Sequence, residues 1–203
     1  MLVLIPAAAH ALPVISEFFY DAVGSDDGLS FIELYGAPGT PLAGLVLEGV
    51  NGANGAVGPS LALTGVIPAD GIFVVADVTA GGQTSVSGAD LLLDFDFQNG
   101  PDSVVLRDGS LVLDALGYGV FAPGEVFAGE GAPAADPAAG ASLARRFADV
   151  DIGDNAADFV ALETPTPGSA PLSAVPEPAS ASLLGSGLAC LAAGCRRRRR
   201  RPA

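Results

Sequence analysis

Short apolar or alternating segments, separated by turn-forming residues, recur through most of the chain. Between residues 12 and 168, no stretch combines the period and the length of an amphipathic helix. The runs are rich in β-branched and aromatic side chains, which is typical of strands. They are PVISEFFY (13–20), SFIELYG (30–36), GLVLEGV (44–50), SLALTGVI (60–67), GIFVVAD (71–77) and LLLDFDF (91–97).

The clearest pair of strands is SVVLRDGSLVLDALGYG, residues 103–119. Asp108-Gly109 divides it into two β-rich runs, and an Asp-Gly pair suits a type I′ turn, whose two central residues both need positive φ. About eight short strands with polar turns favour an antiparallel sandwich. We therefore predict an all-β fold, an immunoglobulin-like antiparallel β-sandwich over residues 12–168, with a hydrophobic helix only at 179–195.

Charge is distributed very unevenly along the chain. There is no lysine, and six of the nine basic residues are the consecutive arginines near the C-terminus, whereas all 23 acidic residues precede them. Such an acidic body repels phosphate backbones, so we expect no nucleic-acid partner. Divalent cations fit better, because carboxylate oxygens are the ligands that Ca²⁺ prefers.

The N-terminal residues 1–11 are predicted to be a signal peptide. A short apolar run leads into Ala9-His10-Ala11, which has the small-x-small form of a signal-peptidase site. No basic region precedes the run. Either the true start lies upstream of Met1 or export uses a degenerate signal, and the alternative is that the run forms a buried first strand.

Three features follow one another near the C-terminus: the triplet Pro176-Glu177-Pro178, an uncharged stretch at 179–195 and the arginine cluster. The stretch is close to the lower limit of a spanning helix, about 17 residues. Arginines would keep their end on the cytoplasmic side. Basic clusters elsewhere bind nucleic acid or anionic lipid, but this order favours a membrane-held signal.

This order resembles the PEP-CTERM sorting signal of exosortase systems in Gram-negative bacteria. The resemblance implies transient anchoring in the inner membrane, cleavage by an exosortase near the triplet, and delivery to the cell surface or to an exopolysaccharide and biofilm matrix. Residues 175–203 would then be the sorting signal and 169–174 a linker. The residues that carry the motif are Val175, Pro176, Glu177, Pro178, Arg196, Arg197, Arg198, Arg199, Arg200 and Arg201.

The strand segments resemble the lamin-tail domain, an immunoglobulin-like sandwich. Gly36 stands where that family usually has Asn. The resemblance implies a binding adaptor of secreted proteins. It rests on Val14-Ile15-Ser16-Glu17, residues 31–35, Leu42-x-Gly44-Leu45, residues 73–77 and 100–106, Leu113-Asp114-x-x-Gly117-Tyr118-Gly119, Ser142-Leu143-x-Arg145, Asp154-Asn155-x-x-Asp158-Phe159 and residues 165–168.

The loop ADVDIGDNAADF (148–159) is the candidate cation site. Alternating carboxylates can wrap Ca²⁺, although the spacing is not that of an EF-hand. The alternative is a capped turn, in which Asp and Asn side chains bond nearby backbone N–H groups and Arg145 or Arg146 pairs with the acids. The candidate ligands are Asp149, Asp151, Asp154, Asn155 and Asp158.

Two further groups of acids have simpler interpretations. The loop with Asp21, Asp26 and Asp27 reads as a solvated surface. Glu17 and Glu33 lie within apolar strands and could form a glycosidase-like pair, which needs two carboxyl groups about 5–10 Å apart. The alternative is one solvent-facing acid on each strand.

Enzymatic chemistry finds little support in the sequence. Once both ends are removed, the body has no His and no Cys, the usual general base and thiol nucleophile. There is no Gly-x-Ser-x-Gly elbow and no Walker loop. We therefore predict a non-enzymatic, exported binding or adhesion module that engages exopolysaccharide or surface proteins. The alternatives are a secreted carboxylate-dependent hydrolase and a permanently membrane-anchored envelope protein.

Overall fold

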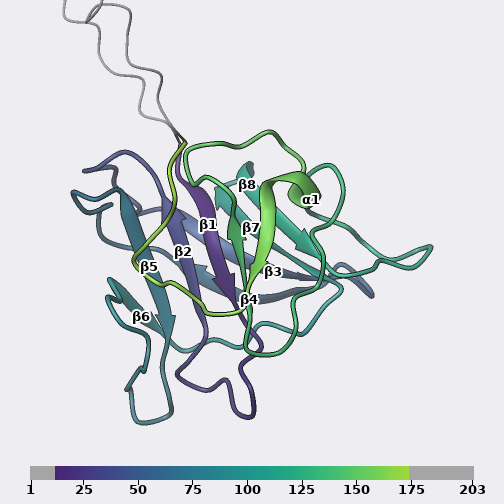
Figure 1. The fold of residues 1–203 in the computed structure, drawn as a ribbon, viewed down its shortest axis with the longest axis horizontal. Helices are drawn as coiled ribbons and strands as arrows, with labels where there is room; N and C mark the ends of the chain where they lie inside the picture. Colours follow the sequence, from purple (N-terminus) through teal and green to yellow (C-terminus); the bar gives the residue numbers. More distant parts are fainter. Residues whose placement is uncertain (1–11, 174–203) are drawn as a thin grey trace, which may run out of the picture. The chain divides into compact units, whose positions relative to one another are not determined.

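The computed structural model describes residues 12–173 (Figure 1). The predicted signal peptide, the hydrophobic segment at 179–195 and the arginine cluster lie outside the described residues. The chain divides into two units, Met1–Ser173 and Ala174–Ala203. Within residues 12–173 there is no helix whose length and hydropathy would allow it to cross a membrane.

Strands dominate the described part of the chain and form two sheets. The six-stranded sheet has the order β10-β9-β1-β2-β5-β6, and the four-stranded sheet has the order β4-β3-β7-β8. Neighbours are antiparallel except β5 and β6. The elements are β1 (Val14–Phe19), β2 (Phe31–Tyr35), β3 (Leu45–Asn51), β4 (Val57–Ala62), β5 (Ile72–Asp77), β6 (Leu91–Leu93), β7 (Asp102–Asp108), β8 (Leu111–Tyr118), β9 (Ser142–Arg145), α1 (Asn155–Asp158) and β10 (Phe159–Leu162). The prediction of an all-β antiparallel sandwich is confirmed.

Aromatic side chains form part of the core between the sheets. The ring of Phe18 stacks on Tyr20 at 4.8 Å between centroids and meets Phe97 edge-on at 5.3 Å. Tyr20 also lies 4.6 Å from Tyr118, and both hydroxyls are satisfied, by Asp136 and by the Gln98 carbonyl. Such pairs add to the free energy of burial, so the core joins β1 to the opposite sheet.

The six-stranded sheet is covered on its outer face as well. Phe19, Phe31 and Val74 alternate with core-facing neighbours and form a second buried cluster there. This explains why β5 reads as a continuous apolar run: both of its faces are buried. Part of the cover is the C-terminal strap, defined here as residues 163–173, which crosses this sheet in Figure 1.

The β7–β8 hairpin forms where the sequence predicts it, but its turn is of another kind. Asp108 pairs with Leu111, so Gly109 and Ser110 are the central residues. Gly109 has φ 56°, whereas no non-glycine residue among those described has positive φ. The type I′ prediction is therefore wrong, because a positive φ at the first central residue alone is the type II′ pattern.

Candidate functional site

Arg145, on β9, is the centre of the most highly connected polar cluster in the described residues. Its side chain is fully buried. Nε donates to the Ile15 carbonyl at 3.0 Å, and Nη2 donates to both oxygens of Asp114 at 2.9 and 3.0 Å. Nη1 donates to Asp151 and Asp158, each at 3.1 Å. The bidentate pair with Asp114 joins β9 of one sheet to β8 of the other.

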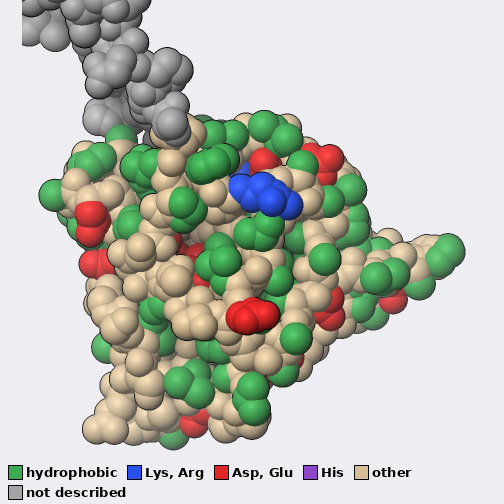
Figure 2. Space-filling view, in the orientation of Figure 1, with side chains coloured by type: hydrophobic (Ala, Val, Ile, Leu, Met, Phe, Trp, Pro, Cys, Tyr) green, Lys and Arg blue, Asp and Glu red, His purple; other side chains and the backbone are tan. Residues whose placement is uncertain are grey.

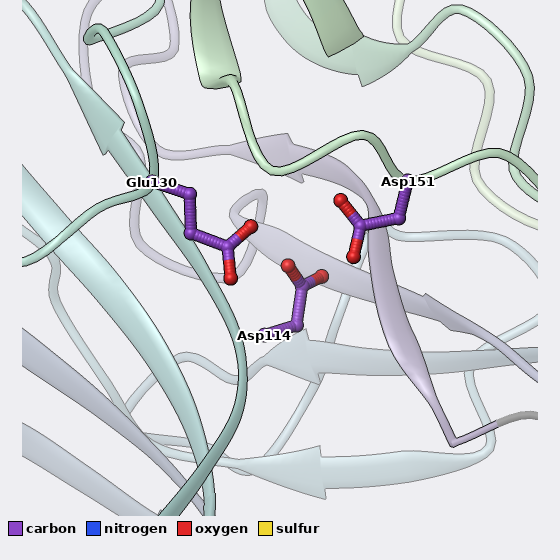
Figure 3. Close-up of side chains that lie close together, drawn as sticks. All are labelled: Asp114, Glu130 and Asp151. Atoms are coloured by element: carbon purple, nitrogen blue, oxygen red, sulfur yellow. The ribbon is translucent and has the colours of Figure 1, made fainter.

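Three carboxylates converge in the structure, as Figure 3 shows, and two of them bond the Arg145 guanidinium. Asp114, Glu130 and Asp151 each offer one oxygen, and these oxygens lie within 4.8 Å of one another. Arg145 bonds Asp114 and Asp151, whereas Glu130 Oε2 is buried and has no hydrogen-bond partner among residues 12–173. Converging carboxylates can hold a hard cation or share a proton. Here Arg145 already supplies one positive charge.

Glu130 is the member of the cluster with the most perturbed acidity. Burial, together with the charges of Asp114 and Asp151, raises the pKa of Glu130 to about 7. Raising an acid's pKa on folding favours the folded state at low pH. The contribution is complete below the ordinary value near 4.5 and is lost as pH rises through about 7.

Replacing Glu130 with Gln should therefore stabilise the fold at pH 8 and change little at pH 5. We expect a gain of about 1–2 kcal/mol at pH 8, discounted for partial solvent screening. Urea unfolding at the two pH values measures it. The same difference between wild type and variant at both values would contradict this assignment.

The five predicted cation ligands lie in the same region but do not share one site. Asp151 and Asp158 bond Arg145, as one alternative anticipated. Asp154 caps α1 by accepting from Ala156 N. Asn155 and Asp149 bond other parts of the fold, described below. Asp151, Asp154 and Asp158 also accept bonds from nearby backbone N–H groups, as in a capped turn, and calcium binding at this loop stays a prediction.

The sequence interpretation missed two members of the carboxylate cluster. Asp114 lies on β8, where a lone acid in an apolar strand was a usable signal. Glu130 comes from an Ala-, Gly- and Pro-rich loop with no pattern of its own. Asn155 explains its position, since Asn155 Oδ1 accepts from Glu130 N at 2.9 Å and from Gly117 N at 2.8 Å.

Glu17 and Glu33 stand directly opposite each other on β1 and β2. The interpretation as solvent-facing acids is wrong, because both side chains are buried on the outer face of the sheet. Burial raises the pKa of Glu33, and the neighbouring charge of Glu17 adds to the rise, although bonds from Ser16 and Gly168 oppose it.

The C-terminal strap covers this glutamate pair. Thr166 donates its N–H to Glu17 at 2.9 Å and its hydroxyl at 2.7 Å, and Gly168 N donates to Glu33 at 2.8 Å. Ser142 donates its hydroxyl to Glu17 Oε1 as well, and Ser16 donates its hydroxyl to Glu33 Oε1. Both carboxylates are therefore fully bonded beneath the chain rather than facing an open cleft.

The last described residues are held by a separate set of bonds. Ala148 N donates to the Pro171 carbonyl at 2.8 Å. Asp149 accepts from Ser173 N at 2.6 Å and from its hydroxyl. These two bonds lower the pKa of Asp149. The described fold thus stays attached to its own C-terminal segment as far as Ser173.

Two surface hollows complete the description. One, of about 620 Å³, is lined by Leu12, Tyr35, Pro38, Asp149 and Asp151 among others. Asp26 and Asp27 of the second acidic loop line a smaller hollow of about 240 Å³, together with Ser30, Asp77, Asp94, Phe95 and Asp96. Figure 2 shows acidic side chains scattered over one face and basic ones confined to a single area.

Comparison with known families identifies the segment that follows the folded part. Residues 174–200 match the PEP-CTERM protein-sorting motif. The match begins one residue before Val175 and confirms the predicted sorting signal. It supports an exported bacterial protein that is processed by an exosortase and sorted to the cell surface. Neither the comparison with curated proteins nor that with solved structures returned a match.

Proposed function

We propose that this protein is a non-enzymatic binding or adhesion module, delivered to the cell surface or extracellular matrix by its sorting signal. The observation that carries the proposal is the order of the chain: an ordered β-sandwich through Ser173, followed at once by the matched motif at 174–200. The sandwich would be a lamin-tail-like adaptor that engages exopolysaccharide or another surface protein. The host would be a Gram-negative bacterium, with transient anchoring in the inner membrane.

The bonding of Arg145 and of the buried glutamate pair supports a non-catalytic role. Arg145 has every nitrogen bonded, and Glu17 and Glu33 accept bonds beneath the strap. A glycosidase needs two carboxyl groups flanking an accessible substrate bond, so this pair does not favour the hydrolase alternative. Acidic side chains on the surface favour uncharged polysaccharide, or polysaccharide bridged by Ca²⁺.

Processing is tested by expressing the full chain in a bacterium with an active exosortase. We expect the mature protein to lack the arginine cluster and to appear at the surface or in the medium. Glu177→Ala should keep the chain at full length in the membrane fraction, because it removes the only charge of the triplet. Intact-mass measurement of each fraction is the readout.

A matched control is Asp94→Ala, which removes an exposed acid outside both the strap and the sorting motif and should leave processing unchanged. Mature wild-type protein that retains its arginines beside an active exosortase would contradict the proposal. It would favour the permanently anchored alternative instead.

A further inference from the structure

We propose that the C-terminal strap limits access of the exosortase to the chain, so that cleavage requires residues 170–173 to leave the folded domain first. This inference rests on the proposed function in one respect, cleavage near residues 176–178. It adds a regulatory role for Asp149, which neither the motif nor its processing assigns.

The strap is held at two places that differ in burial. The inner anchor consists of the bonds from Thr166 and Gly168 to the buried carboxylates of Glu17 and Glu33. The outer anchor is the bond from Ala148 to Pro171 and the pair of bonds from Ser173 to Asp149, which is exposed to solvent. Bonds to buried charges are harder to replace with water than exposed ones. The outer anchor can therefore open while the inner one stays closed.

The short stretch of chain between Ser173 and the Pro-Glu-Pro triplet is the reason why the outer anchor has to open. Pro176 is three residues beyond Ser173, so a fully extended chain places it no more than about 10 Å from the last bonded residue. A domain of this size has a radius of gyration of about 15 Å. Such a short tether keeps the folded body, which is larger than the tether itself, beside the membrane-embedded protease and hinders the entry of residues 176–178 into its active site.

Release of the outer anchor lengthens the free chain between the folded domain and Pro176. The chain is then free beyond Ser169, whose N–H donates to the Thr166 carbonyl, and seven residues reach about 24 Å to Pro176. No strand has to separate, since β10 ends at Leu162. The cleavage rate should therefore follow the fraction of molecules whose outer anchor is open.

The decisive variant is Asp149→Ala, measured as the half-time of processing in a pulse-chase with an active exosortase. Asp149 accepts both bonds from Ser173, so its removal should raise the open fraction and speed cleavage about tenfold. Asp94→Ala is the matched control, because it removes an exposed acid elsewhere and should process at the wild-type rate. Unfolding of Asp94→Ala should match wild type, whereas Asp149→Ala should lower the free energy of unfolding by no more than about 1.4 kcal/mol, which corresponds to the tenfold change in the open fraction. Limited proteolysis at 170–173 should increase only for Asp149→Ala.

A second pair of chains separates strap release from recognition of the motif. Insertion of eight Gly/Ser residues between Ser173 and Ala174 lengthens the chain between the folded domain and the motif without opening the outer anchor. The extended wild type should be processed as fast as Asp149→Ala, and adding Asp149→Ala to it should bring no further gain.

Equal rates for wild type, Asp149→Ala and the extended chain would overturn the strap proposal alone and leave exosortase processing intact. Failure of all these chains to be processed would overturn both, since it would show that the motif is not cleaved. The two failures are thus distinguishable.

Discussion

Replacing Arg145 with Met should lower the free energy of unfolding by about 3–5 kcal/mol. The substitution preserves much of the side-chain volume but removes the charge between Asp114, Asp151 and Asp158. The side chain of Asp114 is fully buried, and its loss of a bidentate partner leaves a charge that water cannot solvate. Burial raises the pKa of Asp114, and the charge of Arg145 is the main influence that opposes the rise. Urea unfolding at pH 7 measures the loss.

Two comparisons test the cause of this loss. Arg146→Met removes a neighbouring arginine whose side chain is exposed and donates to the Ala157 carbonyl, and it should cost less than about 1 kcal/mol. Adding Asp114→Leu to Arg145→Met should recover part of the stability, because the orphaned charge is then gone. A loss below about 1 kcal/mol for Arg145→Met would show that the buried network does not hold the sheets together.

Asn155→Ala should cost about 2–4 kcal/mol, because one amide satisfies three backbone groups. Asn155 Oδ1 accepts from Gly117 N and Glu130 N, and its Nδ2 donates to the Ala115 carbonyl at 2.8 Å. The substitution leaves these groups without partners beside β8. Thermal and urea unfolding give the magnitude, and hydrogen exchange at Gly117 should accelerate.

The adjacent Asp154→Ala is the natural comparison for Asn155→Ala. Asp154 caps α1 with a bond to Ala156 N, so its loss should cost only about 1 kcal/mol. If the two variants lose the same stability, Asn155 acts merely as part of the cap. That result would remove its role as the link between α1, β8 and the loop of Glu130.

Local patterns predicted the strands well but their partners poorly. The runs at 13–20, 30–36 and 71–77 became β1, β2 and β5, and these strands are neighbours. Nothing in the alternation showed that β6 would pair parallel to β5. Nor did it show that β9 would add to β1, from more than a hundred residues away. Periodicity reports which face of a strand is buried, whereas the choice of partner depends on long-range packing.

The acidic residues show even more clearly that local sequence patterns do not predict long-range contacts. Glu17 and Glu33 looked like single acids in separate apolar strands. The antiparallel register places them opposite each other, and the strap then buries both. Asp149 and Asp151 are two residues apart, yet one holds Ser173 and the other Arg145. Spacing along a loop does not determine which oxygens converge.

The sequence by itself determined the destination of this protein and the class of its fold. The sorting motif at 174–200 depends on the linear order of triplet, apolar stretch and arginines, and strand alternation is equally local. Only the tertiary structure decided that Arg145 would join Asp114 of the opposite sheet, and that the strap would close over Glu17 and Glu33. These contacts join residues far apart in the chain, and they form only after the sheets have paired and excluded water.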